Sequence, residues 1–389
     1  MRTRLFIRAA GLLIAATAAA TAFASDTLKI GLILPMTGHF GPSGQQVTAG
    51  ARLYMALHGD TINGKKVQLI IKDDVAAPES TKRLAQELVV NEKVDVLAGF
   101  GLTPLALAAA PIATQSKTPM VVMVAATSRV IDASPYIVRS SFTMPQVAMG
   151  IAKWAPANGI KRVMTLVTDY GPGHDTEAAF KKYFSEAGGE VVESLRVPMS
   201  NPDFGPALQR VRNQAPDALF VFVAESSGLA VMKEFNDRGL GKAGIKLIGT
   251  GDMVGDDILN DMGDVALGIV TSHHYSAAHP TEVNKQFVEA YGKGNGGNRP
   301  NFMSIAGYDG MHVIYEAFKK AGGAAGGDAL LAAMRGVQFE SPRGPVTIDA
   351  ETRDIVQNVY LRKVEKVDGQ LYNVEFDAME AVKNPVGAQ

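Results

Sequence analysis

Cysteine is missing from this sequence of 389 residues, so no disulfide can stabilise the fold, which has to depend on its core. A bias of charge is missing as well, since 38 lysine and arginine residues stand against 39 aspartate and glutamate residues. The two signs are interspersed and form no basic block, so we expect no nucleic-acid partner. No apolar run reaches the roughly 20 residues that a membrane-spanning helix needs.

Motifs of common catalytic and cofactor-binding sites are also missing. There is no G-x-x-x-x-G-K-[ST] phosphate loop and no G-x-S-x-G nucleophile elbow. The glycines from Gly249 to Gly255 are spaced one residue too widely for a dinucleotide fingerprint. His273 and His274 are adjacent, and adjacent residues of a strand point to opposite faces, so we do not expect them to share a metal. The sequence thus predicts no enzyme, no cofactor and no metal site.

The beginning of the chain has the features of a secretory signal peptide. Three arginines precede the apolar segment 9–20, and Ala22-Phe23-Ala24 places small residues where a signal peptidase needs them. We expect cleavage after Ala24, so that residues 1–24 are the signal peptide. A membrane anchor is the competing interpretation, but the apolar segment is too short to span. Because no cysteine follows it for lipid attachment, we expect a soluble periplasmic protein.

The stretch from Val94 to Thr127 predicts a binding edge. Its pattern indicates a strand ending at Gly99, a helix opening at Thr103-Pro104, and a strand that ends at Ala125-Ala126-Thr127. Threonine can accept hydrogen bonds from the first helical turn, and proline suits that turn. Ligands of open α/β sheets bind where parallel strands end, and the free N–H groups of a helix start favour a carboxylate. Two ordinary turns between strand and helix would give the same pattern.

The rest of the chain repeats this alternation of strand and helix, which predicts an α/β fold with parallel sheets. A length of 389 residues favours two domains. The pattern breaks near 134–142 and restarts as a second unit built like the first. The helices after about 275 lack strands of their own and are expected to return to the first lobe, and the closing strands to cross again. The predicted division is 25–140 and 275–345 for lobe 1, and 141–274 and 346–389 for lobe 2.

Three segments together carry a family resemblance. They are the opening KIGLILPMTGHFGPSGQQVTAGARLY, the Ala125-Ala126-Thr127 motif and the closing GPVTID. With these segments the chain resembles the type I periplasmic solute-binding proteins of ABC importers, in particular the leucine/isoleucine/valine-binding family. The resemblance implies two Rossmann-like lobes with parallel central sheets, joined by a three-stranded hinge. Such lobes trap a ligand by hinge closure.

The resemblance also implies roles for residues of the first lobe. Thr103 falls at the first hydroxyl position that holds the ligand carboxylate. The carbonyl of Ala125 and the hydroxyl and amide of Thr127 match the family motif directly, and Phe40 stands where an aromatic side chain covers the ligand. This lobe is expected to bind the carboxylate first.

In the second lobe, Tyr170 matches a family Tyr-Gly-x-Gly turn, and Asp252 lies where amino-acid binders place a carboxylate against the ligand ammonium. One departure is clear, because the segment 224–227 has no aromatic residue where amino-acid-binding members often have one. The predicted cargo is therefore a branched-chain or related amino acid, with an aromatic or keto carboxylate as the alternative. In that case Asp252 would meet a ligand hydroxyl or a water.

The resemblance predicts capture of a small carboxylate and its delivery to an inner-membrane ABC permease by a monomer. An extracytoplasmic ligand sensor with the same fold is an alternative, against which the lack of an anchor argues. An exported α/β enzyme is another, against which the lack of a catalytic arrangement argues.

Overall fold

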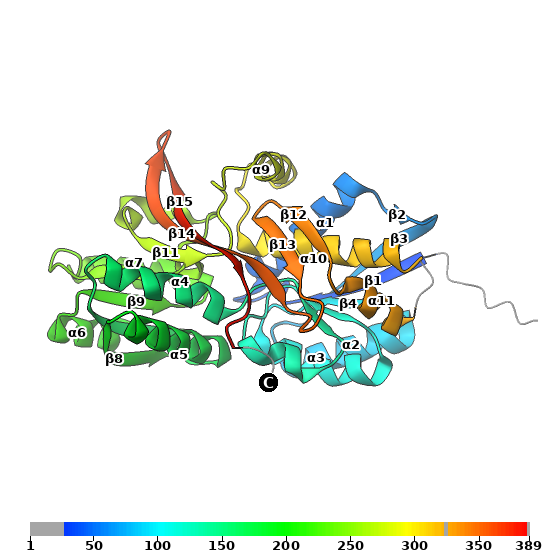
Figure 1. Ribbon diagram of the computed structural model, residues 1–389, viewed down its shortest axis with the longest axis horizontal. Coiled ribbons are helices and arrows are strands. Elements are labelled where there is room, and N and C mark those ends of the chain that lie inside the picture. The colour runs from blue at the N-terminus through cyan, green and yellow to red at the C-terminus, as the bar shows by residue number, and fades with distance from the viewer. Residues whose placement is uncertain (1–26, 323–325, 387–389) are drawn as a thin grey trace, which may run out of the picture.

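The computed structural model describes residues 27–322 and 326–386 (Figure 1). The predicted signal peptide lies outside these residues. Within them the chain forms two α/β lobes that lie side by side, the first drawn mainly in blue, cyan and yellow and the second mainly in green. The predicted fold class is confirmed. No helix of this part of the chain is long and apolar enough to cross a membrane.

The first lobe is built, within the described residues, on a six-stranded sheet in the order β2-β3-β1-β4-β5-β6. Its strands are β1 (Thr27–Leu34), β2 (Thr61–Ile62), β3 (Lys65–Asp73), β4 (Val96–Gly99), β5 (Met120–Val122) and β6 (Ile137–Arg139). All pairs are parallel except β2 with β3. The helices of this lobe are α1 (Gly41–His58), α2 (Pro78–Glu87), α3 (Thr103–Ser116), α9 (Glu282–Gly294), α10 (Phe302–Lys320) and α11 (Gly327–Met334), with a π-helical turn at Leu88–Glu92 and a 3-10 helix at Ser128–Ala133.

The second lobe is built, in the same part of the chain, on a nine-stranded sheet in the order β12-β13-β14-β11-β10-β9-β7-β8, with β15 also paired to β14. Its strands are β7 (Arg162–Thr168), β8 (Glu190–Val197), β9 (Ala218–Phe222), β10 (Lys246–Thr250), β11 (Val270–His273), β12 (Gln338–Ser341), β13 (Gly344–Ile348), β14 (Ile355–Val367) and β15 (Gln370–Val382). The five neighbouring strands β8, β7, β9, β10 and β11 pair in parallel, and the remaining pairs are antiparallel. The helices are α4 (Met144–Ala157), α5 (Gly171–Glu186), α6 (Gly205–Gln214), α7 (Glu225–Asp237) and α8 (Leu259–Met262), with 3-10 helices at Gly251–Val254 and Gly263–Ala266.

The chain passes between the lobes three times. It leaves the first sheet after β6, returns after β11 to helices α9, α10 and α11, and crosses again along β13 and β14 (Figure 1). Val346, Ile348 and Ile355 pack in the core of the first lobe, although β13 and β14 are hydrogen-bonded in the sheet of the second. The third crossing therefore lies within these two strands.

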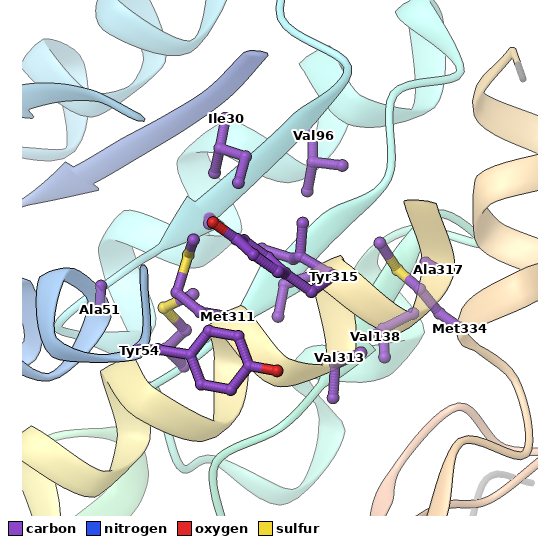
Figure 2. Close-up of a cluster of buried hydrophobic side chains, with 14 of the residues drawn as sticks. Ile30, Ala51, Tyr54, Val96, Val138, Met311, Val313, Tyr315, Ala317 and Met334 are labelled. Carbon is purple, nitrogen blue, oxygen red and sulfur yellow. The ribbon is translucent and has the colours of Figure 1, made fainter. Parts of the chain in front are cut away.

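The core of the first lobe is closed by α10, which packs on α1. The two helices approach so closely that a Cβ on Gly50 would lie 1.9 Å from the Ser304 carbonyl oxygen, and a Cβ on Gly307 1.9 Å from that of Val47. Glycine is therefore needed at both positions. Figure 2 shows Met311 and Tyr315 of α10 reaching into a cluster with side chains of the central strands, among them Ile30 and Val96. This packing explains why helices after the second unit belong to the first lobe.

Three local expectations were wrong. Thr103 does not cap α3: it is the first helical residue, Leu102 occupies the N-cap, and the Thr103 hydroxyl is engaged with another side chain. Helix α5 begins at Gly171, so the turn predicted up to Gly173 is already helical. His273 and His274 do not diverge. Because β11 ends at His273, the strand alternation stops there, and the two ring centroids are 4.4 Å apart.

Candidate functional site

A cavity lies between the lobes, where the strands of both sheets end. The loops after β1, β4 and β5 form one wall, and the segments after β7, β9 and β10 form the other. The lining residues are Leu34, Pro35, Phe40, Ser43, Gly44, Val47, Gly101, Leu102, Thr103, Val124, Ala125, Ala126, Phe142, Met144, Tyr170, Pro172, Phe222, Ala224, Asp252, Phe302 and Met303. Most of these are apolar, as is typical of small-molecule sites with few polar anchors.

The side-chain polar groups of the first wall are hydroxyls, of which Ser43 supplies one and Thr103 and Thr127 the others. The Oγ1 atoms of Thr103 and Thr127 lie 2.7 Å apart and form a hydrogen bond. Thr103 lines the cavity, and Thr127 stands directly behind it. No side chain caps the start of α3. Pro104 has no N–H and the Leu105 and Ala106 amides donate to the Leu102 carbonyl, so of the first turn the Thr103 amide remains for a ligand at this wall. This wall contains neutral donors and no carboxylate, which suits an anion.

A buried arginine holds the backbone of this wall in place. Arg139 Nη1 donates to the Thr127 carbonyl at 2.7 Å, and Nη2 donates to the Ser128 carbonyl at 2.7 Å. Its Nε lies 2.8 Å from Asp354 Oδ1, so the buried charge is paired. Nearby, the Ala125 carbonyl accepts from the Ser141 hydroxyl at 3.4 Å. The segment 125–128 is therefore positioned before any ligand arrives.

Aromatic side chains from five different elements surround the middle of the cavity: Phe40, Phe142, Tyr170, Phe222 and Phe302. The rings of Tyr170 and Phe222 are nearly parallel, with centroids 6.2 Å apart. Phe142 and Phe302 meet edge to face at 6.1 Å. Such a lining favours a flat ligand that can stack or meet ring edges.

A histidine pair lies behind this aromatic lining. His274 stacks on Phe142 at 4.4 Å, and His273 meets the edge of Phe302 at 4.7 Å. Burial lowers the pKa of both imidazoles well below the ordinary value, so both are neutral. Across the described residues, no group of three or more His, Asp or Glu side chains is placed to hold a metal ion.

The second wall carries a carboxylate. Asp252 is only 7 % exposed, and its Oδ2 has no hydrogen-bond partner. The neutral ring of His273 places its Nε2 3.7 Å from this oxygen, too far for a hydrogen bond. Burial raises the pKa of Asp252 to about 6, although the Thr250 hydroxyl, its own amide and Arg362 act in the opposite direction. Burial also raises the pKa of Tyr170, and the charge of Asp252 adds to this.

The structure brings five of the six predicted site residues to the cavity. Phe40, Thr103, Ala125, Tyr170 and Asp252 line it. Thr127 reaches it through its bond to Thr103.

Sequence reasoning missed the other aromatic residues, Phe142, Phe222 and Phe302. Only Phe222 had a usable signal. The sequence predicts a strand over 218–223, and Phe222 lies next to its end, at the edge where ligands bind.

The two walls are in contact, so the cavity is closed in this structure. A Cβ on Gly171 of the second lobe would lie 3.0 Å from the Thr127 hydroxyl of the first. A side chain at position 171 would crowd this hydroxyl. Glycine therefore allows the start of α5 to approach the first wall.

Comparison with known proteins gives a consistent result. A family model described as periplasmic binding protein matches residues 27–370. A Leu/Ile/Val-binding protein homolog 6 from Brucella suis is 43% identical over 371 residues, which cover 94% of this chain and 95% of that protein.

Solved structures extend the comparison. A solute binding protein of an ABC transporter from Rhodopseudomonas palustris BisB5, in complex with 3,4-dihydroxybenzoic acid, is 59% identical with a TM-score of 0.91, covering 93% of this chain and 99% of that one. A solute binding protein from Rhodopseudomonas palustris HaA2, in complex with p-hydroxybenzoic acid, is 43% identical with a TM-score of 0.89, covering 92% and 98%.

Proposed function

The chain belongs to the periplasmic binding protein family as the solute-binding protein of an ABC transporter, and we propose that its cargo is a small aromatic carboxylate with a hydrogen-bond donor at its far end. The observation that carries this proposal is the unpaired Oδ2 of Asp252 in a mainly apolar cavity with five aromatic rings in its lining. A carboxylate there needs a donor from the ligand, since a buried unsatisfied charge is costly.

The ligand carboxylate is proposed to bind the first wall. Thr103 and Thr127 supply hydroxyl donors, and the Thr103 amide lies at the start of α3, where the helix dipole favours an anion. The hydroxyl pair exchanges its internal hydrogen bond for bonds to the anion, which are stronger because the acceptor is charged. Ala125 contributes backbone and shape to this wall.

The aromatic ring of the ligand is proposed to lie among Phe40, Phe142, Phe222 and Phe302, with Tyr170 beside Phe222. The far end then meets Asp252, whose carboxylate accepts from a phenolic hydroxyl. The two neighbours above, with hydroxybenzoic acids bound, support this choice over an aliphatic cargo.

An amino acid is the second candidate. The same Asp252 carboxylate would pair with an ammonium group, and the Brucella relative is named as a Leu/Ile/Val-binding protein homolog. The ammonium of an α-amino acid sits next to its carboxylate, so both would have to be reached from one end of the ligand.

The remaining assignments are proposals that follow from the family. The protein works in the periplasm after removal of residues 1–24, delivers its cargo to an inner-membrane permease, acts as a monomer, performs no catalysis and binds no nucleic acid. We place the first lobe at 25–140 and 275–345, and the second at 141–274 and 346–389. A ligand sensor with the same fold would bind the same cargo, but would need a signalling partner in place of a permease.

Calorimetry on the refolded, ligand-free protein tests the cargo. The panel is 3,4-dihydroxybenzoate, 4-hydroxybenzoate, benzoate and leucine. We expect both hydroxylated acids to bind about tenfold or more tightly than benzoate, the difference expected for one hydrogen bond to a charged group. If leucine binds more tightly than all three aromatic acids, the amino-acid candidate replaces this proposal.

A further inference from the structure

Among the hydrogen bonds that join the lobes outside the cavity, two sets end on an aspartate of the second lobe. In the first, the amide and the hydroxyl of Ser128 both donate to Asp175 Oδ2, at 2.6 and 2.8 Å. Ser128 follows β5 in the first lobe, and Asp175 lies on α5 of the second. We name this contact the Ser128 clasp. Both hydrogen bonds have the same carboxylate oxygen as acceptor, and hydrogen bonds to a charged acceptor are stronger than neutral ones.

The second contact is centred on Asp257 of the second lobe. Its Oδ2 accepts from Gln46 Nε2 at 2.7 Å, and its Oδ1 accepts from Asn301 Nδ2 at 3.0 Å. Gln46 is on α1, and Asn301 is the N-cap residue of α10, so both donors belong to the first lobe. We name this contact the Asp257 clasp. Asn301 Nδ2 also donates to Gln46 Oε1 at 3.0 Å, which links the two donors to each other.

The donors of both clasps are fixed by their own lobe. Arg139 donates to the Ser128 carbonyl at 2.7 Å. The Asn301 side chain accepts from the amide of Ser304, as a helix cap does. Donors that are already ordered lose little conformational entropy when the lobes meet. More of the bond energy is then available to hold the lobes together.

The clasps flank the cavity on both sheets. In the first sheet the Ser128 clasp follows β5 and the Asp257 clasp starts from the helix after β1, with β4 between those strands. In the second sheet the clasps follow β7 and β10, with β9 between them. The segments after β4 and β9 line the cavity, whereas none of the five clasp residues does. The two clasps therefore close the rim on either side without lining the cavity itself.

We propose that the two clasps set how tightly and how long any cargo is held, while leaving unchanged which cargo is preferred. Opening of the lobes breaks the bonds to Asp175 and Asp257, because each of them joins one lobe to the other. Their energy therefore belongs to the closed state and not to a particular ligand. A protein whose closed state is populated less binds every ligand more weakly by the same factor. The proposal deepens the capture role given above, but does not depend on the identity of the cargo.

The absence of native cysteine allows the closure to be measured directly. Lys82→Cys on α2 and Lys233→Cys on α7 place one spin label on an exposed position of each lobe. Pulsed electron resonance then gives the distance distribution between the lobes in the free protein and with saturating 3,4-dihydroxybenzoate. The same preparations give the dissociation constant and the release rate for this probe and for 4-hydroxybenzoate.

The test variants are Asp175→Ala and Asp257→Ala, with Ser128→Ala as a milder form that keeps the backbone bond. Glu186→Ala is the matched control, because it removes an exposed carboxylate from the far end of the same helix as Asp175. For each aspartate variant we expect about tenfold weaker binding and faster release for both probes, with the ratio of the two affinities kept within twofold. Ser128→Ala is expected to lose less affinity than the aspartate variants, and Glu186→Ala is expected to lose none. Circular dichroism and the melting temperature verify folding.

The outcomes separate this proposal from that of the cargo. A smaller population of the short distance in the free or loaded variant supports the clasps, as does an equal loss for both probes. A change in the ratio of affinities, or distances and affinities that both match the wild type, overturns the proposal. If neither probe binds the wild type, the aromatic cargo is refuted. The proposal about the clasps is then tested by comparing the distance distributions of the ligand-free variants with that of the ligand-free wild type.

Discussion

The two walls of the cavity differ in the kind of polar group they offer. The first wall presents the paired hydroxyls of Thr103 and Thr127 beside a helix start, and its lining includes no ionisable side chain. The second presents the carboxylate of Asp252 with one oxygen unpaired. A wall of donors suits an anion, and a wall with a buried carboxylate suits a donor. The difference gives the cargo an orientation, with its carboxylate toward the first lobe.

The largest effect is expected from the first wall. Thr103→Val keeps the shape of the side chain and removes the hydroxyl that lines the cavity, and it also leaves the Thr127 hydroxyl without this partner. We expect about 10- to 100-fold weaker binding of every carboxylate in the panel, hydroxylated or not, because a bond to the charged end is lost. Calorimetry checks this. A loss confined to the hydroxylated acids would reverse the orientation.

Thr127→Val is a matched comparison, because its hydroxyl stands behind that of Thr103. It is also expected to weaken all carboxylates, but by less than Thr103→Val.

Asp252→Asn tests the second wall of the cavity. We expect about tenfold weaker binding of 4-hydroxybenzoate and little change for benzoate, which has nothing to donate. An equal loss for both acids would contradict the role of Asp252.

The same variant is expected to make the free protein more stable at neutral pH. The folded pKa of Asp252, about 6, is above its ordinary value, so folding favours the protonated form, and the charge present at pH 7 is a cost. Stability from this group therefore rises as pH falls from about 6 toward 4. Asp252→Asn removes the cost of the buried charge, so the melting temperature at pH 7.5 should rise. Thermal scans in the absence of ligand would measure this.

The smallest effect is the dependence of affinity on pH. A ligand hydroxyl that donates to the Asp252 carboxylate competes with a proton, so the affinity for 4-hydroxybenzoate should fall several-fold between pH 7 and pH 5. Benzoate should change less over the same range. The affinity of Asp252→Asn should be nearly independent of pH, and calorimetry at four pH values would detect a deviation. A steeper fall for benzoate than for 4-hydroxybenzoate would contradict the assignment.

Much of the fold was predictable because strand and helix alternate clearly along the chain. The apolar run after the first crossover predicts a strand over Arg162–Thr168, and these are the bounds of β7. Strands β12 and β15 were missed. The side chains of β15 are largely exposed or only half-buried, so it lacks the apolar run that marks a central strand. The short strand β2 was hidden by the turn at Asn63-Gly64, where both residues have positive φ.

The sequence by itself determined which residues stand at the ends of parallel strands, since small and hydroxyl-bearing residues interrupt apolar runs there. That was enough to find the first wall, where Thr103 and Ala125 are close along the chain. Tertiary structure decided the rest. Phe142, Phe222 and Phe302 come together from a crossover, a strand end and a helix start, and Gln46 meets Asp257 from 211 residues away. Such contacts depend on the path of the backbone and on closure of the lobes, and no local pattern encodes either.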